Sequence, residues 1–208
     1  MRCLFKKVFA IEGNIGAGKS TLLNVLDNKI DNCVVIQEPV LDWKNVGGED
    51  LLACFYKEPK RWAFTFELYS MFSKIKRLRE ALRGDAEIIF MERSIYSDKA
   101  FHHISYYLDK MDTKEASILQ TLYDEFKEAY PKLNGVIYVD TKPEECWRRI
   151  KARGRKEEQG ITIEYLNKLQ EQFIQTNYET RMVMIDGIYD LKKPYKIIDS
   201  IKKFVDTN

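Results

Sequence analysis

The residues that most directly indicate chemistry lie at positions 13–20, Gly-Asn-Ile-Gly-Ala-Gly-Lys-Ser, which match G-x-x-x-x-G-K-[ST] at every fixed position. They follow an apolar run, residues 8–11, and precede a helix-like stretch. In this context, glycines let backbone N–H groups wrap a triphosphate, and the N-terminus of the following helix faces it. Lys19 would neutralise the β- and γ-phosphates, and Ser20 would ligate Mg²⁺. The motif predicts nucleotide binding but leaves the phosphoryl acceptor open.

Two further polar groups follow short apolar runs. Glu38 comes after residues 34–37 and before Pro39, whose ring favours an extended backbone at Glu38. A carboxylate there could accept a proton from an attacking hydroxyl, although a surface glutamate would look the same in sequence. Glu92 and Arg93 follow another run and could hold Mg²⁺ and orient an oxygen nucleophile; a structural ion pair is the alternative.

A basic segment surrounds Gly154 and contains Arg149, Arg153 and Arg155. Arg149 and Arg153 are four residues apart, so they share one face if the predicted helix continues that far. Planar guanidinium groups suit phosphate oxygens, and a basic segment beside a glycine is typical of a mobile lid. The alternative interpretation is a solvated charged stretch.

Aromatic residues gather between positions 43 and 69. Trp43, Phe55, Tyr56 and Phe66 could line an apolar slot for a flat ring, with Glu67 as its polar contact. Composition alone would place the aromatic side chains in the core instead. Both interpretations stay open at this point.

Bulk properties narrow the class of protein. The 208 residues suit one α/β domain, residues 1–208, and 34 basic against 32 acidic residues give no overall field that would attract nucleic acid or a membrane surface. No apolar run approaches the ~18 residues of a membrane span. The four cysteines have no metal-binding spacing, and no signal or transit peptide is evident. We therefore expect a soluble cytoplasmic protein.

The elements that must position these residues alternate between short apolar runs and longer helical patterns. Together they predict a doubly wound, five-stranded parallel sheet of the P-loop NTPase type, flanked by helices, with the arginine-rich lid beside it. Ligands in such sheets gather beyond the carboxyl ends of the strands, where the candidate residues lie. Asp140, also at a strand end, is interpreted as a turn residue. The expected strands span 4–11, 34–37, 87–91, 136–139 and 182–185, and the expected helices span 19–27, 59–82, 97–108, 114–129, 143–152, 163–180 and 194–205.

In combination, these segments resemble the eukaryotic-type deoxyribonucleoside kinases, most of all their deoxycytidine and deoxyguanosine kinases. The resemblance covers nearly the whole chain. It is carried by residues 11–21, by Glu-Pro-Val at 38–40 with Trp43, by residues 56–69, by Glu-Arg-Ser-Ile-Tyr-Ser-Asp at 92–98, and by Arg-Gly-Arg-Lys-Glu-Glu-Gln-Gly-Ile at 153–161.

The resemblance implies ATP-dependent phosphorylation of a deoxynucleoside 5′-hydroxyl, a step of nucleotide salvage. Glu38 resembles the base that accepts the hydroxyl proton, Arg93 the residue that holds the hydroxyl, and Glu92 the partner of Ser20 at Mg²⁺. Tyr56 and Glu158 match the residues that grip the sugar 3′-hydroxyl. The predicted ATP contacts are Gly13, Asn14, Ile15, Gly16, Ala17, Gly18, Lys19, Ser20, Thr21, Arg149, Arg153 and Arg155, and the predicted nucleoside contacts are Glu38, Trp43, Phe55, Tyr56, Phe66, Glu67, Lys74, Arg93, Asp98 and Glu158.

The base pocket departs from the family pattern. Glu67 stands where the family usually has Gln, Lys74 replaces the usual Arg, and His102 falls where an aromatic residue is usual. An ionised carboxylate only accepts hydrogen bonds, which suits the two adjacent donors of guanine. Cytosine or adenine would require a protonated Glu67 or an altered pose in the pocket. Asp98 matches the cytidine- and purine-preferring members. We therefore expect a deoxycytidine/deoxypurine kinase, with guanine favoured by Glu67 and thymine disfavoured by Asp98.

Two rival functions share the nucleotide-binding motif. A nucleoside monophosphate kinase of the thymidylate kinase type would need a site for a 5′-phosphate, which Glu38 would repel. A catalytically inert nucleotide-binding regulatory protein would not need Lys19, Ser20, Glu38 and the Glu92–Arg93 pair together. The resemblance also implies a homodimer, for which the helices expected at 97–108 and 114–129 offer a face.

Overall fold

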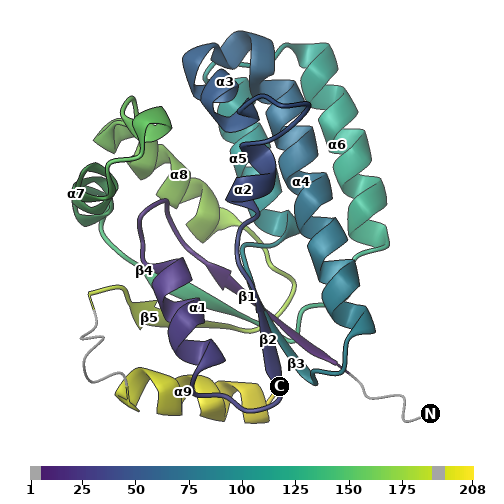
Figure 1. Ribbon diagram of the computed structural model, residues 1–208, viewed down its shortest axis with the longest axis vertical. Coiled ribbons are helices and arrows are strands. Elements are labelled where there is room, and N and C mark those ends of the chain that lie inside the picture. The colour runs from purple at the N-terminus through teal and green to yellow at the C-terminus, as the bar shows by residue number, and fades with distance from the viewer. Residues whose placement is uncertain (1–5, 189–194) are drawn as a thin grey trace.

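A five-stranded, all-parallel sheet forms the centre of the computed structural model, which describes residues 6–188 and 195–208 (Figure 1). The strand order is β2-β3-β1-β4-β5, so the predicted parallel α/β sheet is confirmed. The strands are β1 (Lys7–Glu12), β2 (Cys33–Ile36), β3 (Ile88–Glu92), β4 (Gly135–Asp140) and β5 (Met182–Asp186).

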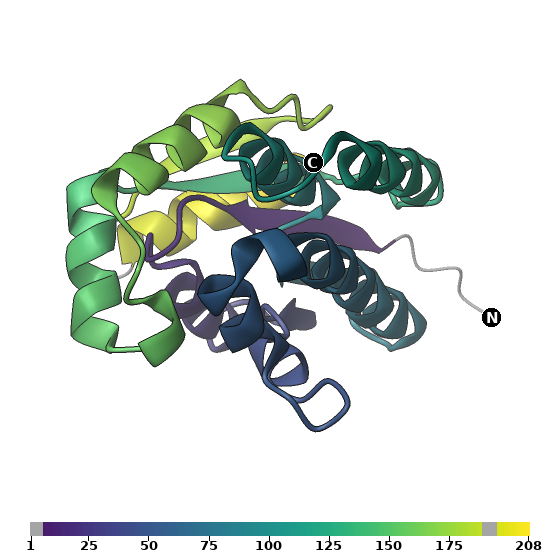
Figure 2. The same ribbon diagram turned by 90° about the horizontal axis from the view of Figure 1, so that it is seen from above.

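Helices cover both faces of the sheet (Figure 2). Beyond the 3₁₀ turn η1 (Lys156–Glu158), the helices of the described residues are α1 (Lys19–Asp27), α2 (Val40–Trp43), α3 (Leu51–Lys57), α4 (Pro59–Arg83), α5 (Ile95–Tyr107), α6 (Thr113–Glu128), α7 (Pro143–Arg153), α8 (Ile163–Gln175) and α9 (Tyr195–Asp206).

Side-chain alternation along the strands builds a separate core on each face. In β1, Phe9 and Ile11 point into one core with α1 and α9, whereas Val8 and Ala10 point into the other with α4 and α6. All four are at most 1% exposed. Successive strand residues face opposite sides of a sheet, so a strand that is apolar throughout must be covered twice.

Two predicted element boundaries require correction, and two short helices were missed. The helix expected at 163–180 ends at Gln175, because Thr176 is extended. The strand expected at 4–11 begins at Lys7, and residues 4 and 5 lie outside the described part of the chain. The last helix was expected to start at residue 194, which also lies outside the described residues. The two short helices α2 and α3 were not predicted and lie between β2 and α4.

The carboxyl edge of the sheet gathers the candidate residues. β1 leads into the glycine-rich loop, β2 is followed by Glu38, and β3 ends at Glu92 with Arg93 next. β3 and β1 are paired, with Ile11 opposite Glu92, so residues 81 positions apart in the sequence meet at one site. None of the helices in the described ranges is both long and apolar enough to cross a membrane.

Candidate active site

The phosphate-binding loop, residues 13–20, joins β1 to α1. Gly13, Gly16 and Gly18 have φ angles of 136°, 78° and 107°, a region that residues with side chains rarely occupy. A Cβ atom at Gly13 would also lie 2.6 Å from the carbonyl oxygen of Val139. The close approach of loop and sheet therefore requires glycine, and it leaves the loop backbone free to surround a phosphate group.

One large cavity of about 1290 Å³ opens above this loop. Pockets for a single small ligand usually have roughly 300–1,000 Å³, so this cavity has room for a nucleotide and a second small molecule. Of the predicted site residues, Gly13, Asn14 and Ala17 belong to the loop but do not line the cavity. The predicted residues that do line the cavity are Ile15, Gly16, Gly18, Lys19, Ser20, Thr21, Glu38, Trp43, Phe55, Tyr56, Phe66, Glu67, Lys74, Glu92, Arg93, Asp98, Arg149, Arg153, Arg155 and Glu158.

Lys19 is buried at the floor of the cavity. Its Nζ donates a hydrogen bond to the Asn14 carbonyl oxygen at 2.8 Å and lies 3.8 Å from Glu92 Oε1. Burial, together with the nearby Arg93, lowers the pKa of Lys19 to about 8, against the opposing effect of Glu92. The ammonium group is therefore charged at neutral pH and directed into the loop, where it can neutralise a phosphate.

Ser20 and Glu92 form a compact pair of oxygen ligands. The Ser20 hydroxyl donates to Glu92 Oε2 at 2.9 Å. Mg²⁺ commonly takes one or two protein oxygens and completes its shell with phosphate and water, so these residues fit the ion. Within the described ranges, no cluster of three or more His, Cys, Asp or Glu side chains could hold a metal by itself.

Glu38 and Arg93 form the central ion pair, with Arg93 Nε 2.9 Å from Glu38 Oε1. Burial alone would raise the pKa of Glu38, but the charges of Arg93 and Lys19 outweigh it and lower the pKa. Glu92 and Arg93 therefore have different partners, and the alternative of a simple Glu92–Arg93 ion pair is wrong. Glu38 is an ionised carboxylate that lines the cavity, as a general base must be.

The segment around Gly154 contributes guanidinium groups to the lining of the cavity. Helix α7 continues to Arg153, as the spacing required, and ends in Gly154 at φ 70°. Arg153 Nη2 and Arg155 Nη1 contact the two carboxylate oxygens of buried Glu158 at 2.6 Å and 3.1 Å. Arg149 instead donates to the Ala17 carbonyl oxygen at 2.9 Å, which fixes it against the phosphate-binding loop.

The aromatic residues form a slot that is both packed and open to the cavity. The rings of Phe55 and Phe66 are stacked with centroids 4.7 Å apart, and Trp43 meets Phe66 edge-on at 5.3 Å. The Trp43 indole N–H donates to Ser73 Oγ at 2.9 Å, so the polar end of the ring is satisfied. Trp43 and Phe55 are largely buried but also line the cavity, so the core and slot interpretations both apply.

Polar groups line the cavity beside this slot. Lys74 and Asp98 form a buried ion pair between α4 and α5, and Glu67 accepts a hydrogen bond from the Ser105 hydroxyl. Burial raises the pKa of Asp98, although Lys74 opposes the shift. A flat ring held between the aromatic side chains would meet hydrogen-bonding groups at its edge.

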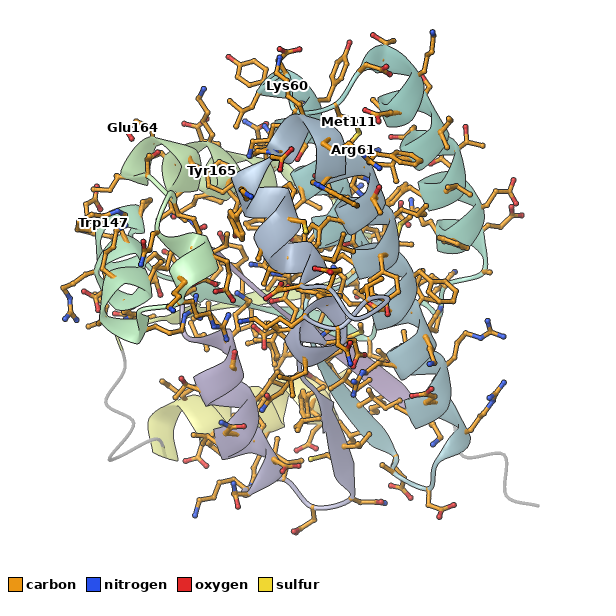
Figure 3. All side chains as sticks on the ribbon, turned by 45° about the horizontal axis from the view of Figure 1, so that its top comes forward. Lys60, Arg61, Met111, Trp147, Glu164 and Tyr165 are labelled. Atoms are coloured by element: carbon orange, nitrogen blue, oxygen red, sulfur yellow. The ribbon has the colours of Figure 1, made fainter. Side chains whose placement is uncertain are left out.

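Several cavity residues were not predicted from the sequence. Tyr165 of α8 lines the cavity, and Figure 3 shows it on the side of its helix toward α3 and α4. Phe101 also lines it, with its ring centroid 4.8 Å from the Arg93 guanidinium carbon. Both residues lie in stretches that have only a helical pattern, so no local motif distinguishes them from core residues.

Comparisons with known proteins agree with this arrangement. The family model for deoxynucleoside kinases matches residues 9–206. Human deoxycytidine kinase is 35% identical, in an alignment covering 97% of this chain and 92% of that protein. A probable deoxycytidine kinase of fowlpox virus is also 35% identical, in an alignment covering 96% of this chain and 88% of that protein. The mitochondrial deoxyguanosine kinase of Xenopus laevis is 33% identical, in an alignment covering 80% of this chain and 71% of that protein.

Proposed function

The chain belongs to the deoxynucleoside kinase family, and from that premise we propose that it transfers the γ-phosphoryl group of ATP to the 5′-hydroxyl of deoxycytidine or a purine deoxynucleoside. The family membership makes it a deoxyribonucleoside kinase, with ATP as phosphoryl donor and a small nucleoside as substrate. The observation that carries the assignment of roles is the Glu38–Arg93 ion pair beside the phosphate-binding loop.

Glu38 acts as the general base. A phosphoryl transfer demands mainly positioning and charge neutralisation, together with a group that accepts the proton of the attacking hydroxyl. Glu38 is ionised, lines the cavity and is held by Arg93 Nε at 2.9 Å. Arg93 keeps other N–H groups available for the hydroxyl oxygen and the incoming phosphoryl group.

The donor side is formed by the phosphate-binding loop and Lys19. Ser20 and Glu92 would hold Mg²⁺, which when bound neutralises charge on the phosphate oxygens. Arg153 and Arg155 close over the phosphates as a lid, while Arg149 supports the loop from the side. Since Arg153 and Arg155 contact Glu158, phosphate would compete with that carboxylate for them.

The acceptor side holds the sugar and the base. Tyr56 and Glu158 line the cavity and would bind the 3′-hydroxyl, while the rings of Trp43, Phe55 and Phe66 enclose the base. Asp98 matches the cytidine- and purine-preferring members of the family, and we infer from that resemblance that it disfavours thymine. These features support a deoxycytidine/deoxypurine substrate class.

A substrate panel tests the proposed function. Purified protein with ATP and Mg²⁺ should convert deoxycytidine, deoxyadenosine and deoxyguanosine to monophosphates and leave thymidine as the poorest substrate, measured by chromatography of the products. Deoxynucleoside monophosphates should not be consumed. Consumption of thymidine monophosphate would instead support the thymidylate kinase type, and no product from any acceptor would support the inert nucleotide-binding protein.

The assembly of the enzyme belongs to the same proposal. We expect a homodimer formed through α5 and α6, where Ile118 of α6 and Tyr107 at the end of α5 are 50% and 67% exposed. Light scattering coupled to size exclusion should give twice the chain mass of 24.6 kDa. A cytoplasmic location, tested by cell fractionation, is likewise a prediction.

A further inference from the structure

Glu67 occupies an unusual position for a carboxylate. It lies on α4, lines the cavity and is only 4% exposed. Within the described part of the chain, no Lys or Arg forms an ion pair with it; Lys74, one heptad further along the helix, pairs with Asp98 instead. A buried carboxylate without a cation favours its neutral form, since burial penalises the charge.

Ser105 makes the two oxygens of Glu67 unequal. Its hydroxyl donates a hydrogen bond to Oε1. Oε2 has no hydrogen-bond partner among the described residues, and it lies 3.6 Å from His102 Nε2, too far for a hydrogen bond. Because Oε1 already accepts from Ser105, Oε2 is the oxygen left to carry a proton.

The charged and titratable groups around Glu67 come from every neighbouring element. Asp98 and His102 face it from α5, Lys74 from its own helix, Lys110 from the α5–α6 connection, and Tyr165 from α8. Burial is the largest influence and, with the charge of Asp98, raises the pKa of Glu67 to about 8, against the opposing effects of Ser105, Lys110 and Lys74.

His102 does not supply a compensating positive charge. Burial and the nearby Lys74 lower its pKa to about 3, so the ring is neutral at physiological pH. The contact between Glu67 and His102 therefore involves two neutral groups at pH 7, in contrast to the ion pair that their side-chain types would suggest.

We propose that Glu67 reads the base as a neutral carboxylic acid, with Ser105 fixing Oε1 as the accepting oxygen and leaving Oε2–H as the donor. This inference rests on the proposed function. Cytosine offers an acceptor at N3 beside its 4-amino donor, and adenine offers N1 beside its 6-amino group, so both match one donor and one acceptor. Guanine offers two donors, N1–H and the 2-amino group, which match the ionised carboxylate.

The preferred base therefore depends on pH. Below the pKa of about 8, Glu67 presents a donor and an acceptor and selects deoxycytidine or deoxyadenosine. As pH rises through this value, the donor is lost and deoxyguanosine is favoured. The guanine preference expected from an ionised Glu67 thus applies to the alkaline form of the enzyme.

The test compares kcat/KM for deoxycytidine and deoxyguanosine between pH 6.5 and 8.75, where guanine keeps most of its N1 proton; the Glu67→Gln variant measures the remaining effect of guanine ionisation. The ratio should fall by at least about fivefold in the unmodified enzyme, because the protonated fraction of a group with pKa near 8 falls by that factor. The matched variant Glu67→Gln, whose amide cannot ionise, should give a ratio independent of pH. A constant ratio in the unmodified enzyme, or an equal fall in Glu67→Gln, overturns the inference.

Two further measurements keep the test decisive. Ser105→Ala removes the hydrogen bond that favours the charged carboxylate, so the midpoint of the pH dependence should move to higher pH; an unchanged midpoint or a move to lower pH contradicts the role of Ser105. At pH 6.5, the infrared spectrum of the unmodified protein minus that of Glu67→Gln should contain a protonated-carboxyl band, because the other buried carboxyl groups, such as Glu12, are present in both proteins; the absence of this difference band overturns the inference without reference to activity.

The outcomes also separate this inference from the proposed function. If no deoxynucleoside is phosphorylated at any pH, the proposed function fails. If deoxynucleosides are phosphorylated with a ratio that does not change with pH, only the assignment of a neutral Glu67 fails.

Discussion

At the scale of single residues, Arg93 shows how the site maintains an unfavourable backbone conformation. Its φ angle of 64° is rare for a residue with a long side chain and costs on the order of 1–2 kcal/mol. Three kinds of contact hold it there: the Glu38 carboxylate, the Gly13 carbonyl oxygen at 3.1 Å, and the Phe101 and Phe173 rings, at 4.8 Å and 5.1 Å. The backbone turn directs a fully buried guanidinium group at the acceptor site.

We predict that Glu38→Gln lowers kcat/KM by about 10²- to 10⁴-fold, the usual contribution of a general base. The amide preserves the shape of the side chain but cannot accept the hydroxyl proton. Steady-state assays with deoxycytidine measure the loss, and an unchanged far-ultraviolet circular dichroism spectrum shows that the fold is intact. Activity within threefold of the unmodified enzyme would exclude Glu38 as the base.

A second prediction concerns Glu12, a fully buried carboxylate at the end of β1 that accepts hydrogen bonds from Ser94 Oγ at 2.6 Å and Ser97 Oγ at 3.3 Å. Burial raises its pKa to about 7, against the opposing charge of Arg93. A carboxyl group whose pKa is raised by folding stabilises the fold fully below its unfolded pKa of 4.5, and this contribution is lost as pH rises through 7.

Urea unfolding at pH 5 and pH 8 tests this sign. Between these values, Glu12→Gln should gain about 1–3 kcal/mol of stability relative to the unmodified protein, because its neutral amide avoids the cost of burying a charge. Glu128→Gln, on the exposed face of α6, is the matched control and should show no such change. A relative stability of Glu12→Gln that falls with pH would contradict the expected shift.

At the scale of elements, one ion pair joins the end of α2 to η1. Lys44 directly follows Trp43 at the end of α2, and its ammonium group contacts Glu157 in η1. The Glu157 side chain is 8% exposed, and its pKa is lowered chiefly by the hydrogen bond from Lys44. Arg155 directly precedes this turn and Glu158 ends it, so the pair holds the segment that we propose as the lid next to α2.

We predict that Lys44→Met raises KM for deoxycytidine by roughly two- to fivefold, as expected for the loss of a partly exposed pair worth ~0.5–1 kcal/mol. Exchanging the charges, with Lys44→Glu and Glu157→Lys in one protein, should restore most of the loss in steady-state assays. Lys60→Met, which removes the exposed pair with Asp109, is the control. If Lys60→Met had the same effect as Lys44→Met, the lid connection would be excluded.

Much of this arrangement is predictable from sequence, because it depends on local patterns. Apolar runs locate all five strands, and the loop at residues 13–20 and Glu38 lie where their motifs place them. The short helices α2 and α3 were missed because four and seven residues are too few to establish a helical period, although Asp50 caps Ala53 N–H of α3 at 2.8 Å.

The missed site residues have a different cause. Ser105 and Tyr165 act through contacts between α4, α5 and α8, and nothing in their own stretches of sequence records which helix faces them. For the same reason, a sequence can show that residue 67 is Glu, but it cannot show that this side chain is buried near Asp98 and has no Lys or Arg ion-pair partner among the described residues. The protonation state of a side chain depends on tertiary contacts.

At the scale of the whole molecule, the sheet separates two cores and places the candidate site residues at its carboxyl edge. Leu26 of α1 and Leu78 of α4 are each at most 1% exposed, and they belong to opposite cores. Both cores include side chains of β1, so disruption of either face removes support for the same central strand. This arrangement supports the expectation that residues 1–208 act as one domain.

Leu26→Ala and Leu78→Ala test this expectation. Each should reduce the free energy of unfolding by about 2–5 kcal/mol, the usual range for a buried leucine. Circular dichroism and tryptophan fluorescence should report a single coincident transition in each variant. Two separated transitions in either protein would show that the faces unfold independently and would contradict a single cooperative domain.

The phosphate-binding loop has a consequence for the rate at which nucleotide is captured. Its own residues and neighbours restrain it through hydrogen bonds: Lys19 donates to the Asn14 carbonyl oxygen, Asn14 donates to Leu166 O at 2.8 Å, and Thr141 donates to Ala17 O at 2.9 Å. A loop that is shaped in advance has no slow ordering step after encounter, so its association rate follows diffusion and electrostatic attraction. Differences in affinity between nucleotides should then appear in how long each one stays bound.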